Sequence, residues 1–379
     1  MTIKNLLLGS AAVLALGTTA QAADPVAVAL DTCDLLNITG LTISSESNCL
    51  KFEGEVTYDW VYGNYDVNDD VAGVQNTTSD VAWELTATAT ADSDFGPAFA
   101  VIGLEGSSTD STGGGVDSIG FGDAYVGIGD SSSTVLYAGK KGTIGNTDDG
   151  ETLTAVFSVE LSDALGGNVG GHVIQVMSSL GDGATAGFGL EDLDTTNNAT
   201  LVGTVAVSQD WGAAHATVAF DDVLLGGGAW DLHTGGSINA DNLTFQGAFI
   251  TNEASAWQAI LSASAEFDMF TLAAGLNLEP ASMWDFAISG VAAIDDNTTL
   301  TAGFTVNEAS AWSARLEGEF GVSDTLTADA GVTFTSASTS TFDAGLTWAP
   351  GGGYEASVGV EAASSGNYSL STSFEKAFE

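Results

Sequence analysis

Side chains with the spacing of metal ligands stand early in the chain. Asp66, Asn68 and Asp70 begin like a calcium-binding loop. Such a loop needs glycine at its sixth position and a bidentate glutamate at its twelfth. This chain has Val71 and Thr77 there, so the pattern fails.

Two acidic pairs are looser candidates for a divalent cation, Asp148 with Asp149 and Asp192 with Asp194. Short acidic motifs often match by chance. Solvated acidic loops are the simpler interpretation, and we expect no metal site.

Catalytic motifs are also incomplete. None of His172, His215 and His233 stands in a recognisable serine-hydrolase motif. The glycines at 113–115 and 120–122 flank an alternating segment instead of joining a strand to a helix, which argues against a phosphate-binding loop. The sequence therefore predicts no enzyme and no cofactor.

The overall composition is acidic and yet apolar. Fifty Asp and Glu face six Lys and Arg, giving a net charge of −44, which excludes nucleic acid as a partner. The mean hydropathy is nevertheless +0.20. The two values agree if polar and apolar residues alternate one by one, as in a membrane β-barrel. The 48 Gly and 4 Pro suit strands and turns.

The N-terminus predicts export. Lys4, the apolar run 6–16 and the cleavage motif at 20–22 have the order of a secretory signal peptide, so we expect residues 1–22 to be removed. In an exported chain the two cysteines, Cys33 and Cys49, favour a disulfide within an N-terminal segment 23–49. The alternative, a two-cysteine metal site, lacks a nearby histidine.

Alternation of polar and apolar residues sets the fold class. In residues 50–62 the aromatic and aliphatic side chains share one parity and the charged ones the other, and similar patterns recur at 83–90, 270–279, 312–320 and 326–334. Period two places the two sets on opposite faces of a strand. In a membrane barrel the polar set faces the lumen. The predicted lumen-facing residues are Lys51, Glu53, Glu55, Asp59, Glu84, Arg315, Glu317 and Glu319.

Turn lengths and tryptophans assign the two sides of this all-β barrel, which we expect to span residues 50–379. Short connections are predicted at 92–96, 130–133, 294–297, 321–324 and 350–353, and long ones at 63–79, 106–117 and 140–170. Outer-membrane barrels have short periplasmic turns and long external loops. With this threading, six tryptophans stand at external strand ends and Trp348 at a periplasmic end, as in aromatic girdles: Trp60, Trp83, Trp230, Trp257, Trp284 and Trp312.

Several segments resemble the alphaproteobacterial porins, a family of trimeric general-diffusion pores. The leader at 3–12 and 20–24 looks like that family's leader. Cys49-Leu50-Lys51-Phe52-Glu53-Gly54, leading into Tyr58 and Asp59, looks like its first strand. Residues 123–127 and 136–139 are similar to the hairpin that precedes its constriction loop.

The resemblance implies a 16-stranded antiparallel up-and-down transmembrane barrel whose long third external loop folds into the lumen. That loop, 140–170, would carry the constriction residues Lys140, Lys141, Asp148, Asp149 and Glu151. The implied partners are two further copies in a homotrimer, outer-membrane lipid and lipopolysaccharide, the barrel-assembly machinery, and small ions and solutes.

Two departures from the family stand out. Our segmentation finds about 20 strands, and the repeat of 252–257 at 307–312 suggests duplicated hairpins, although some segments could instead be loops or lie inside the lumen. Basic residues are also too few to surround a constriction, so we expect a cation-preferring pore in the outer membrane. The alternative function is a secreted acidic surface-layer or adhesion protein that binds divalent cations. A sugar-specific porin would need aromatic residues in its lumen, whereas most aromatic residues here have the apolar parity.

Overall fold

The computed structural model describes residues 32–64, 76–111, 114–145, 153–155, 169–193, 199–224 and 226–379. The predicted signal peptide lies outside these ranges. No helix among the described residues is long and apolar enough to cross a membrane. The elements are α2 (Thr32–Leu35), β1 (Leu41–Ser44), β2 (Cys49–Gly63), β3 (Asn76–Ala91), β4 (Ala98–Ser111), β5 (Gly114–Gly129), β6 (Thr134–Gly142), β7 (Gly170–Gly181), β8 (Ala184–Glu191), β9 (Thr200–Gln209), β10 (Gly212–Phe220), β11 (Trp230–Ala240), β12 (Leu243–Asn252), β13 (Trp257–Glu266), β14 (Phe270–Leu278), η2 (Pro280–Ser282), β15 (Trp284–Asp295), β16 (Thr298–Asn307), β17 (Trp312–Ser323), β18 (Leu326–Thr335), β19 (Ser340–Gly351), β20 (Tyr354–Ala363) and β21 (Tyr368–Phe378).

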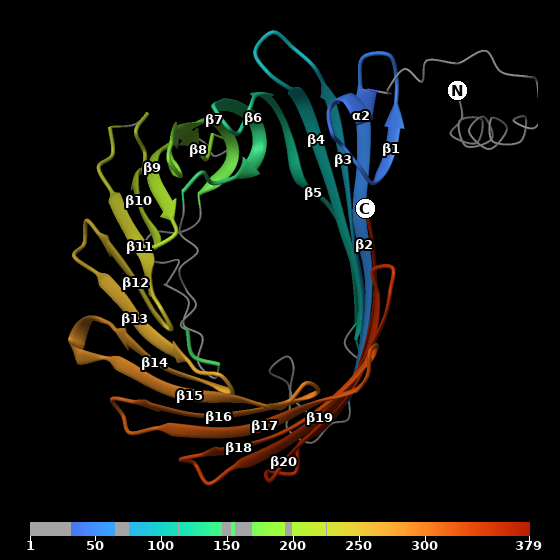
Figure 1. Ribbon diagram of the computed structural model, residues 1–379, viewed down its shortest axis with the longest axis vertical. Coiled ribbons are helices and arrows are strands. Elements are labelled where there is room, and N and C mark those ends of the chain that lie inside the picture. The colour runs from blue at the N-terminus through green and yellow to red at the C-terminus, as the bar shows by residue number, and fades with distance from the viewer. Residues whose placement is uncertain are drawn as a thin grey trace, which may run out of the picture.

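The described strands form one closed antiparallel barrel (Figure 1). Each strand from β2 to β20 pairs with the next in sequence, and β21 closes the ring by pairing with β2 from Gly54↔Phe378 to Gly63↔Ser369. The sheet holds 21 strands. Because β1 stands outside the ring, the barrel itself has 20. The 16 strands implied by the family resemblance are therefore wrong, whereas the segmentation of about 20 strands is confirmed.

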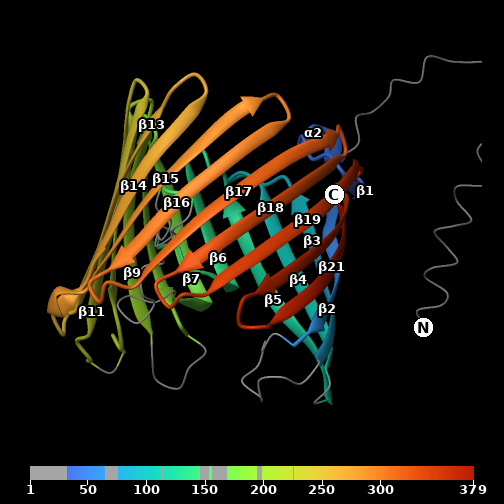
Figure 2. The ribbon, with the colours of Figure 1, turned by 90° about the horizontal axis from the view of Figure 1, so that it is seen from below.

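The strands tilt across the barrel wall between two rims (Figure 2). We call the rim where β2 begins and β21 ends the terminal end, and the opposite rim the loop end. Connections at the terminal end run to no more than the six residues 92–97, and most have two or three. The long connections after β2 and β6 lie at the loop end, as the sequence predicts, and so does the connection after β10, which the sequence analysis does not predict.

The segment 106–117, predicted to be a long external loop, is not a long loop. The segment 106–117 belongs mostly to strands, because β4 continues to Ser111 and β5 begins at Gly114, with pairs such as Ser107↔Ser118. Its serines, threonines and glycines hide the alternation by which a strand is recognised.

The repeated sequence forms two equivalent hairpins at the loop end. In the first, the Ser255 N–H donates to the Asn252 carbonyl (3.0 Å), and in the second the Ser310 N–H donates to the Asn307 carbonyl (2.9 Å). Both serines have a φ of 61°. The repeat spacing spans the four barrel strands β13–β16. These segments are therefore strands, which favours duplicated hairpins over loops inside the lumen.

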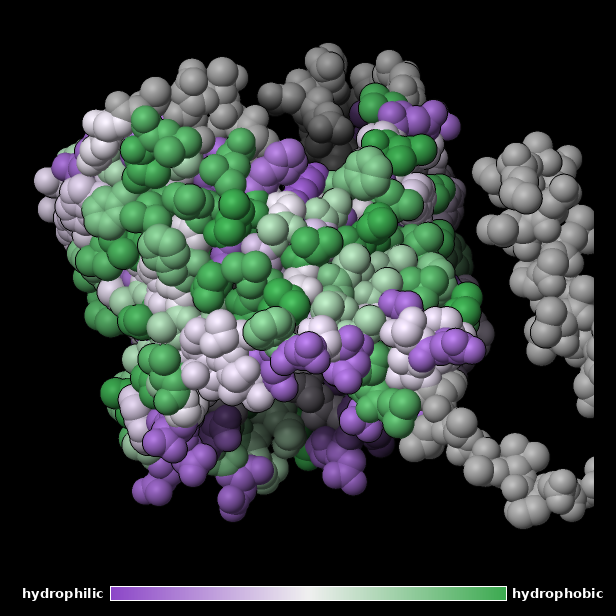
Figure 3. All heavy atoms as spheres, turned by 90° about the horizontal axis from the view of Figure 1, so that it is seen from above, coloured by the Kyte–Doolittle hydropathy of each residue, from purple (hydrophilic) through white to green (hydrophobic). Residues whose placement is uncertain are grey.

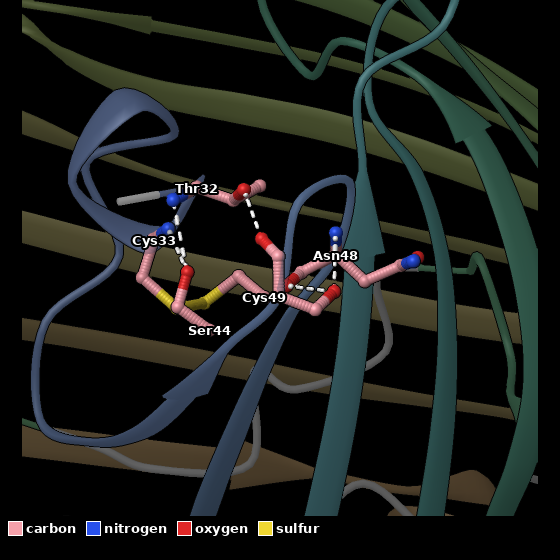
Figure 4. Close-up of a disulfide and its surroundings, with 6 residues drawn as sticks. Thr32, Cys33, Ser44, Asn48 and Cys49 are labelled. Carbon is pink, nitrogen blue, oxygen red and sulfur yellow. Dashed lines mark hydrogen bonds between the residues drawn. A yellow bond between two sulfur atoms is a disulfide. The ribbon is translucent and has the colours of Figure 1, made fainter. Parts of the chain in front are cut away.

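The N-terminal segment is fastened to the barrel by a disulfide (Figure 4). Cys33 in α2 bonds to Cys49 at the start of β2, as the sequence predicts, and both are buried. The Thr32 N–H donates to Ser44 Oγ (2.9 Å). Strand β1 pairs with the first four residues of β2, on the same edge that β21 occupies farther along, and so extends the wall at the terminal end.

We expect the double variant Cys33→Ala/Cys49→Ala to loosen this segment without opening the barrel. A disulfide that closes a loop of this length contributes about 3 kcal/mol, and the 20-strand ring does not depend on it. Limited proteolysis should cut residues 32–48 in the variant and spare them in the unreduced parent. Loss of the heat-modifiable barrel band on a gel would contradict this division.

Candidate functional site

The outer wall of the barrel is apolar. Large hydrophobic side chains are exposed along nearly every strand, for example Ile102, Phe188, Leu272 and Leu316. In the space-filling view, hydrophobic side chains gather over the middle of the face and hydrophilic ones at its lower edge (Figure 3). Such a band with polar rims is the surface of a β-barrel that spans an outer membrane many times.

Tryptophans mark the rims of this band. Trp230, Trp257, Trp284 and Trp312 each begin a strand at the loop end, and Trp348 lies near the terminal end of β19. Trp60 also lies near the loop end, in β2. The predicted place of Trp83 at an external strand end is wrong. Trp83 pairs with Val56 in the middle of β3, and its indole ring packs against Gly106.

The interior faces of β17–β21 and β2–β5 carry most of the charge, and we call this surface the acidic wall. Its side chains alternate with the exposed apolar residues of the same strands. All eight residues predicted to face the lumen lie on it. Its carboxylates are Glu53, Glu55, Asp59, Asp80, Glu84, Glu105, Asp123, Glu317, Glu319, Asp329, Asp343, Glu355, Glu361 and Glu375.

Arg315 is held flat against the acidic wall by its neighbours. Its guanidinium donates to Asp343 through two nitrogens (2.9 and 3.0 Å) and to Glu317 Oε2 through Nε (2.8 Å). Gly331, between these strands, leaves the room for this network, since a Cβ there would lie 2.6 Å from Asp343 Oδ2. A bidentate pair of this kind fixes the geometry of the cation. Two carboxylates thus surround one arginine, and the patch stays negative.

The lysines are placed differently from one another. Lys51 pairs with Glu53 on the acidic wall. Lys141, predicted at the constriction, lies inside with its ammonium 5.0 Å from the Tyr137 ring centre and 5.7 Å from that of Tyr125. Lys140, which the sequence places at the constriction beside Lys141, does not face the interior. It has the parity of Leu136, which is exposed on the outer wall, because β6 continues through Gly142.

The interior faces of β9–β16 differ in character, and we call this surface the neutral wall. Serine, threonine and amide side chains replace most of the carboxylates, and the exceptions are Asp231 and Asp285 near the loop end and Glu266 at the terminal end of β13. Several are buried although they face the interior, including Thr204, Thr217, Gln258 and Ser262. Since a barrel interior is otherwise open, something must cover them.

The beginning of the predicted constriction loop lies against the interior side of β7 and β8, beside the neutral wall. The Ile144 N–H donates to Glu191 Oε1 (2.9 Å), and Gln175 Nε2 bridges that same oxygen (2.8 Å) to the Gly142 carbonyl (2.9 Å). Glu191 and Gln175 are both 0% exposed. A buried carboxylate needs such donors to offset its desolvation. This contact turns the chain inward at the end of β6.

A second contact lies farther around the ring. The Leu153 N–H donates to Ser262 Oγ of β13 (3.2 Å), and the Ala155 N–H donates to Ser289 Oγ of β15 (2.9 Å). The described parts of the loop therefore lie inside the barrel, against the neutral wall, as the fold prediction stated. Asp148, Asp149 and Glu151, the other predicted constriction residues, lie outside the described residues.

We expect Ser262→Ala to release this second contact. The variant removes the acceptor of the partly buried Leu153 N–H, at a cost of about 1 kcal/mol, so hydrogen exchange in the peptide containing Leu153 should quicken roughly fivefold. Ser264→Ala, two residues farther along the same face, is the matched control. Equal exchange in the two variants would mean that the loop is not held by Ser262.

An interior aromatic cluster is one feature that the sequence analysis missed. Phe99, Tyr125 and Tyr137 lie on the inner face of β4–β6 with ring centres 6.0–6.5 Å apart. The alternation with Leu136 and Val126, both exposed outside, could have assigned the two tyrosines to the interior. The three rings come together only through strand register.

No protein-family model matches the sequence, and no curated protein matches it. The solved structures that resemble the chain include several variants of the porin of Rhodopseudomonas blastica. One multiple-alanine variant has a TM-score of 0.43 at 11% identity and covers 87% of this chain and 100% of its own. A tryptophan variant gives 0.44 at 12% with the same coverage. A structure described as "Asymmetric conductivity of engineered proteins" gives 0.43 at 12%.

Proposed function

We propose that this chain forms a water-filled pore in the outer membrane, through which small hydrophilic solutes diffuse passively and cations pass more readily than anions. The observation that carries the proposal is that the described parts of the loop 140–170 and the charged residues lie on opposite interior walls of the barrel. Loop segments lie inside the barrel on the neutral wall, so the passage that remains is bordered by the acidic wall.

Electrostatics supports the cation preference. A narrow aqueous passage with low-dielectric walls focuses the field of its lining charges, enriching counter-ions and depleting co-ions. On the acidic wall Lys51 pairs with Glu53, and Arg315 pairs with Asp343 and Glu317. The other carboxylates of that wall, together with Asp148, Asp149 and Glu151 of the loop, would set the sign of the field.

The proposal includes an orientation and partners. The terminal end would face the periplasm and the loop end the exterior, since outer-membrane barrels keep their short turns on the periplasmic side. Residues 1–22 would direct export. The barrel-assembly machinery would insert the chain, and the resemblance to trimeric porins suggests a homotrimer in contact with lipid and lipopolysaccharide.

A zero-current potential across a planar bilayer under a potassium chloride gradient tests the function. We expect a reversal potential of cation-selective sign at low salt, with the preference weakening as salt rises, because the Debye length falls from about 10 Å at 0.1 M to about 3 Å at 1 M. An anion-selective potential would refute the preference. Absence of channels from a folded barrel would refute the pore. Extraction from cells by chelator or salt alone would support the acidic surface-layer protein instead.

A further inference from the structure

Three aromatic rings line the interior at the edge of the acidic wall. Phe99, Tyr125 and Tyr137 come from the neighbouring strands β4, β5 and β6 (Figure 1), and each of them is half-buried. The described contacts of the loop 140–170 fall on β7, β8, β13 and β15. The rings therefore border the passage that the described parts of the loop leave open.

Glycines on the paired strands make room for these rings. Gly127 pairs with Phe99 on one side and with Tyr137 on the other, and Gly139 pairs with Tyr125. A Cβ at Gly127 would lie 2.3 Å from Phe99 Cζ, and a Cβ at Gly139 would lie 2.8 Å from Tyr125 Cβ. The tilted, edge-on packing of the three rings is a favourable arrangement for aromatic side chains. The register thus holds the rings as a preformed surface.

This aromatic surface already holds an ammonium group. The Lys141 ammonium lies 5.0 Å from the Tyr137 ring centre and 5.7 Å from that of Tyr125. The electron-rich face of an aromatic ring attracts a cation within about 6 Å. Because Gly139 separates Tyr137 from Lys141 on the same face of β6, no side chain stands between them. The faces of both tyrosines can therefore bind an ammonium group.

The surroundings of the rings favour a positively charged solute. Asp123 lies two residues from Tyr125 on the inner face of β5, about 7 Å toward the loop end. Glu105 lies toward the loop end on β4. These carboxylates raise the local concentration of cations and lower that of anions. An uncharged sugar could stack on the rings, but it would gain nothing from this charge.

We propose that Phe99, Tyr125 and Tyr137 form a binding site for small organic cations that carry a methylated ammonium group. In the absence of such a solute the Lys141 ammonium occupies the site, and the solute displaces it. The displaced ammonium would move toward Asp123, which shares its level because Lys140 pairs with Ala124. The proposal rests on the cation-preferring pore of the proposed function and names a class of solute that this pore would retain.

The test measures binding of tetramethylammonium to the folded mature protein in detergent by saturation-transfer NMR. This probe has no N–H group, so it can bind to ring faces but cannot donate a hydrogen bond to a carboxylate. We expect binding of tetramethylammonium and much weaker binding of tert-butanol, an uncharged molecule of similar size. The double variant Tyr125→Leu/Tyr137→Leu should weaken the affinity for tetramethylammonium about tenfold, since two cation–ring contacts are lost.

The matched control removes two tyrosines from the outer wall. Tyr58 is exposed there, and Tyr354 shares the outward parity of Val358. Tyr58→Leu/Tyr354→Leu should keep the affinity of the parent. The heat-dependent gel shift shows whether each variant has folded.

A second variant should strengthen binding, which a folding defect cannot imitate. Lys141→Gln removes the ammonium that competes for the rings, so we expect the affinity for tetramethylammonium to rise about fivefold. Lys51→Gln is its control, because it also removes one interior positive charge. Lys51 lies three strands from Tyr125, about 14 Å at the usual strand spacing. That distance exceeds the Debye length of about 10 Å at 0.1 M salt, so the control should have much less effect.

Four results would overturn the site. Unchanged affinity in Tyr125→Leu/Tyr137→Leu would place the probe elsewhere on the acidic wall. Equal gains in Lys141→Gln and Lys51→Gln would mean that total interior charge sets the affinity. Equal binding of tert-butanol would remove the requirement for a cation, and displacement of the probe by glucose would assign the rings to carbohydrate.

Zero-current potentials of the same samples separate this site from the proposed function. Potassium-preferring channels that do not bind tetramethylammonium would reject the aromatic site alone. Binding of the probe by a folded barrel that forms no channels would reject the pore and leave the site standing.

Discussion

Leu316→Arg should sharply reduce the yield of folded barrel. Leu316 lies in the middle of β17, on the outer wall, and is 54% exposed. An arginine at the bilayer midplane of a barrel costs about 2–4 kcal/mol. The folded fraction in lipid vesicles, measured by the heat-dependent gel shift and by urea titration, should fall accordingly.

Thr301→Arg is the matched control for this variant. Thr301 pairs with Glu317 and lies at nearly the same height on the inner face of β16. An arginine there would face the interior close to carboxylates, so we expect folding close to that of the parent. Equal losses in both variants would mean that the assignment of the two faces is wrong.

Neutralising three carboxylates of the acidic wall should reduce the preference for cations. Glu355 and Glu375 are directly opposed in register, and Glu55 lies on the next strand within two residues of that level. Replacing all three by glutamine removes three neighbouring negative charges from the interior. We expect the ratio of potassium to chloride permeability at low salt to fall about fivefold, as focused fields in narrow passages respond to such changes.

The control for that variant changes the same number of charges elsewhere. Asp241, Asp296 and Asp324 are exposed in short turns at the terminal end. Their replacement by asparagine should leave the permeability ratio nearly unchanged, since exposed charges beyond the passage are screened by salt. A loss of selectivity as large as in the glutamine variant would indicate that the total charge of the protein, rather than its inner wall, sets the preference.

The alternation of polar and apolar residues within each segment was sufficient to predict which face of the wall a side chain occupies and how many strands the barrel has. Side chains alternate across a strand with a period of two, so the residues at 50–62 or 312–320 are sorted into two faces without knowledge of their neighbours. The segmentation into about 20 strands proved better than the number implied by the porin resemblance, because each hairpin carries its own alternation and turn. The disulfide between Cys33 and Cys49 was also predictable, because export and a short separation in sequence suffice to favour a disulfide.

Strand limits were the weaker part of the sequence analysis. The sequence predicts a constriction loop that begins at Lys140, whereas pairing with β7 extends β6 to Gly142. One such shift decides between the lumen and the outer wall, since neighbouring residues face opposite sides.

Only the tertiary structure decided which interior residues meet. Arg315 and Asp343 are 28 residues apart and share an ion pair because β17, β18 and β19 pair in a fixed register. The division into an acidic and a neutral wall arises when the ring closes through β2 and β21, which brings the two charged ends of the chain together. The inward course of the loop likewise depends on Glu191, Ser262 and Ser289, contributed by three distant strands. Alternation along one strand fixes the side that a residue faces, but contacts across a closed barrel depend on register and closure, which no single segment encodes.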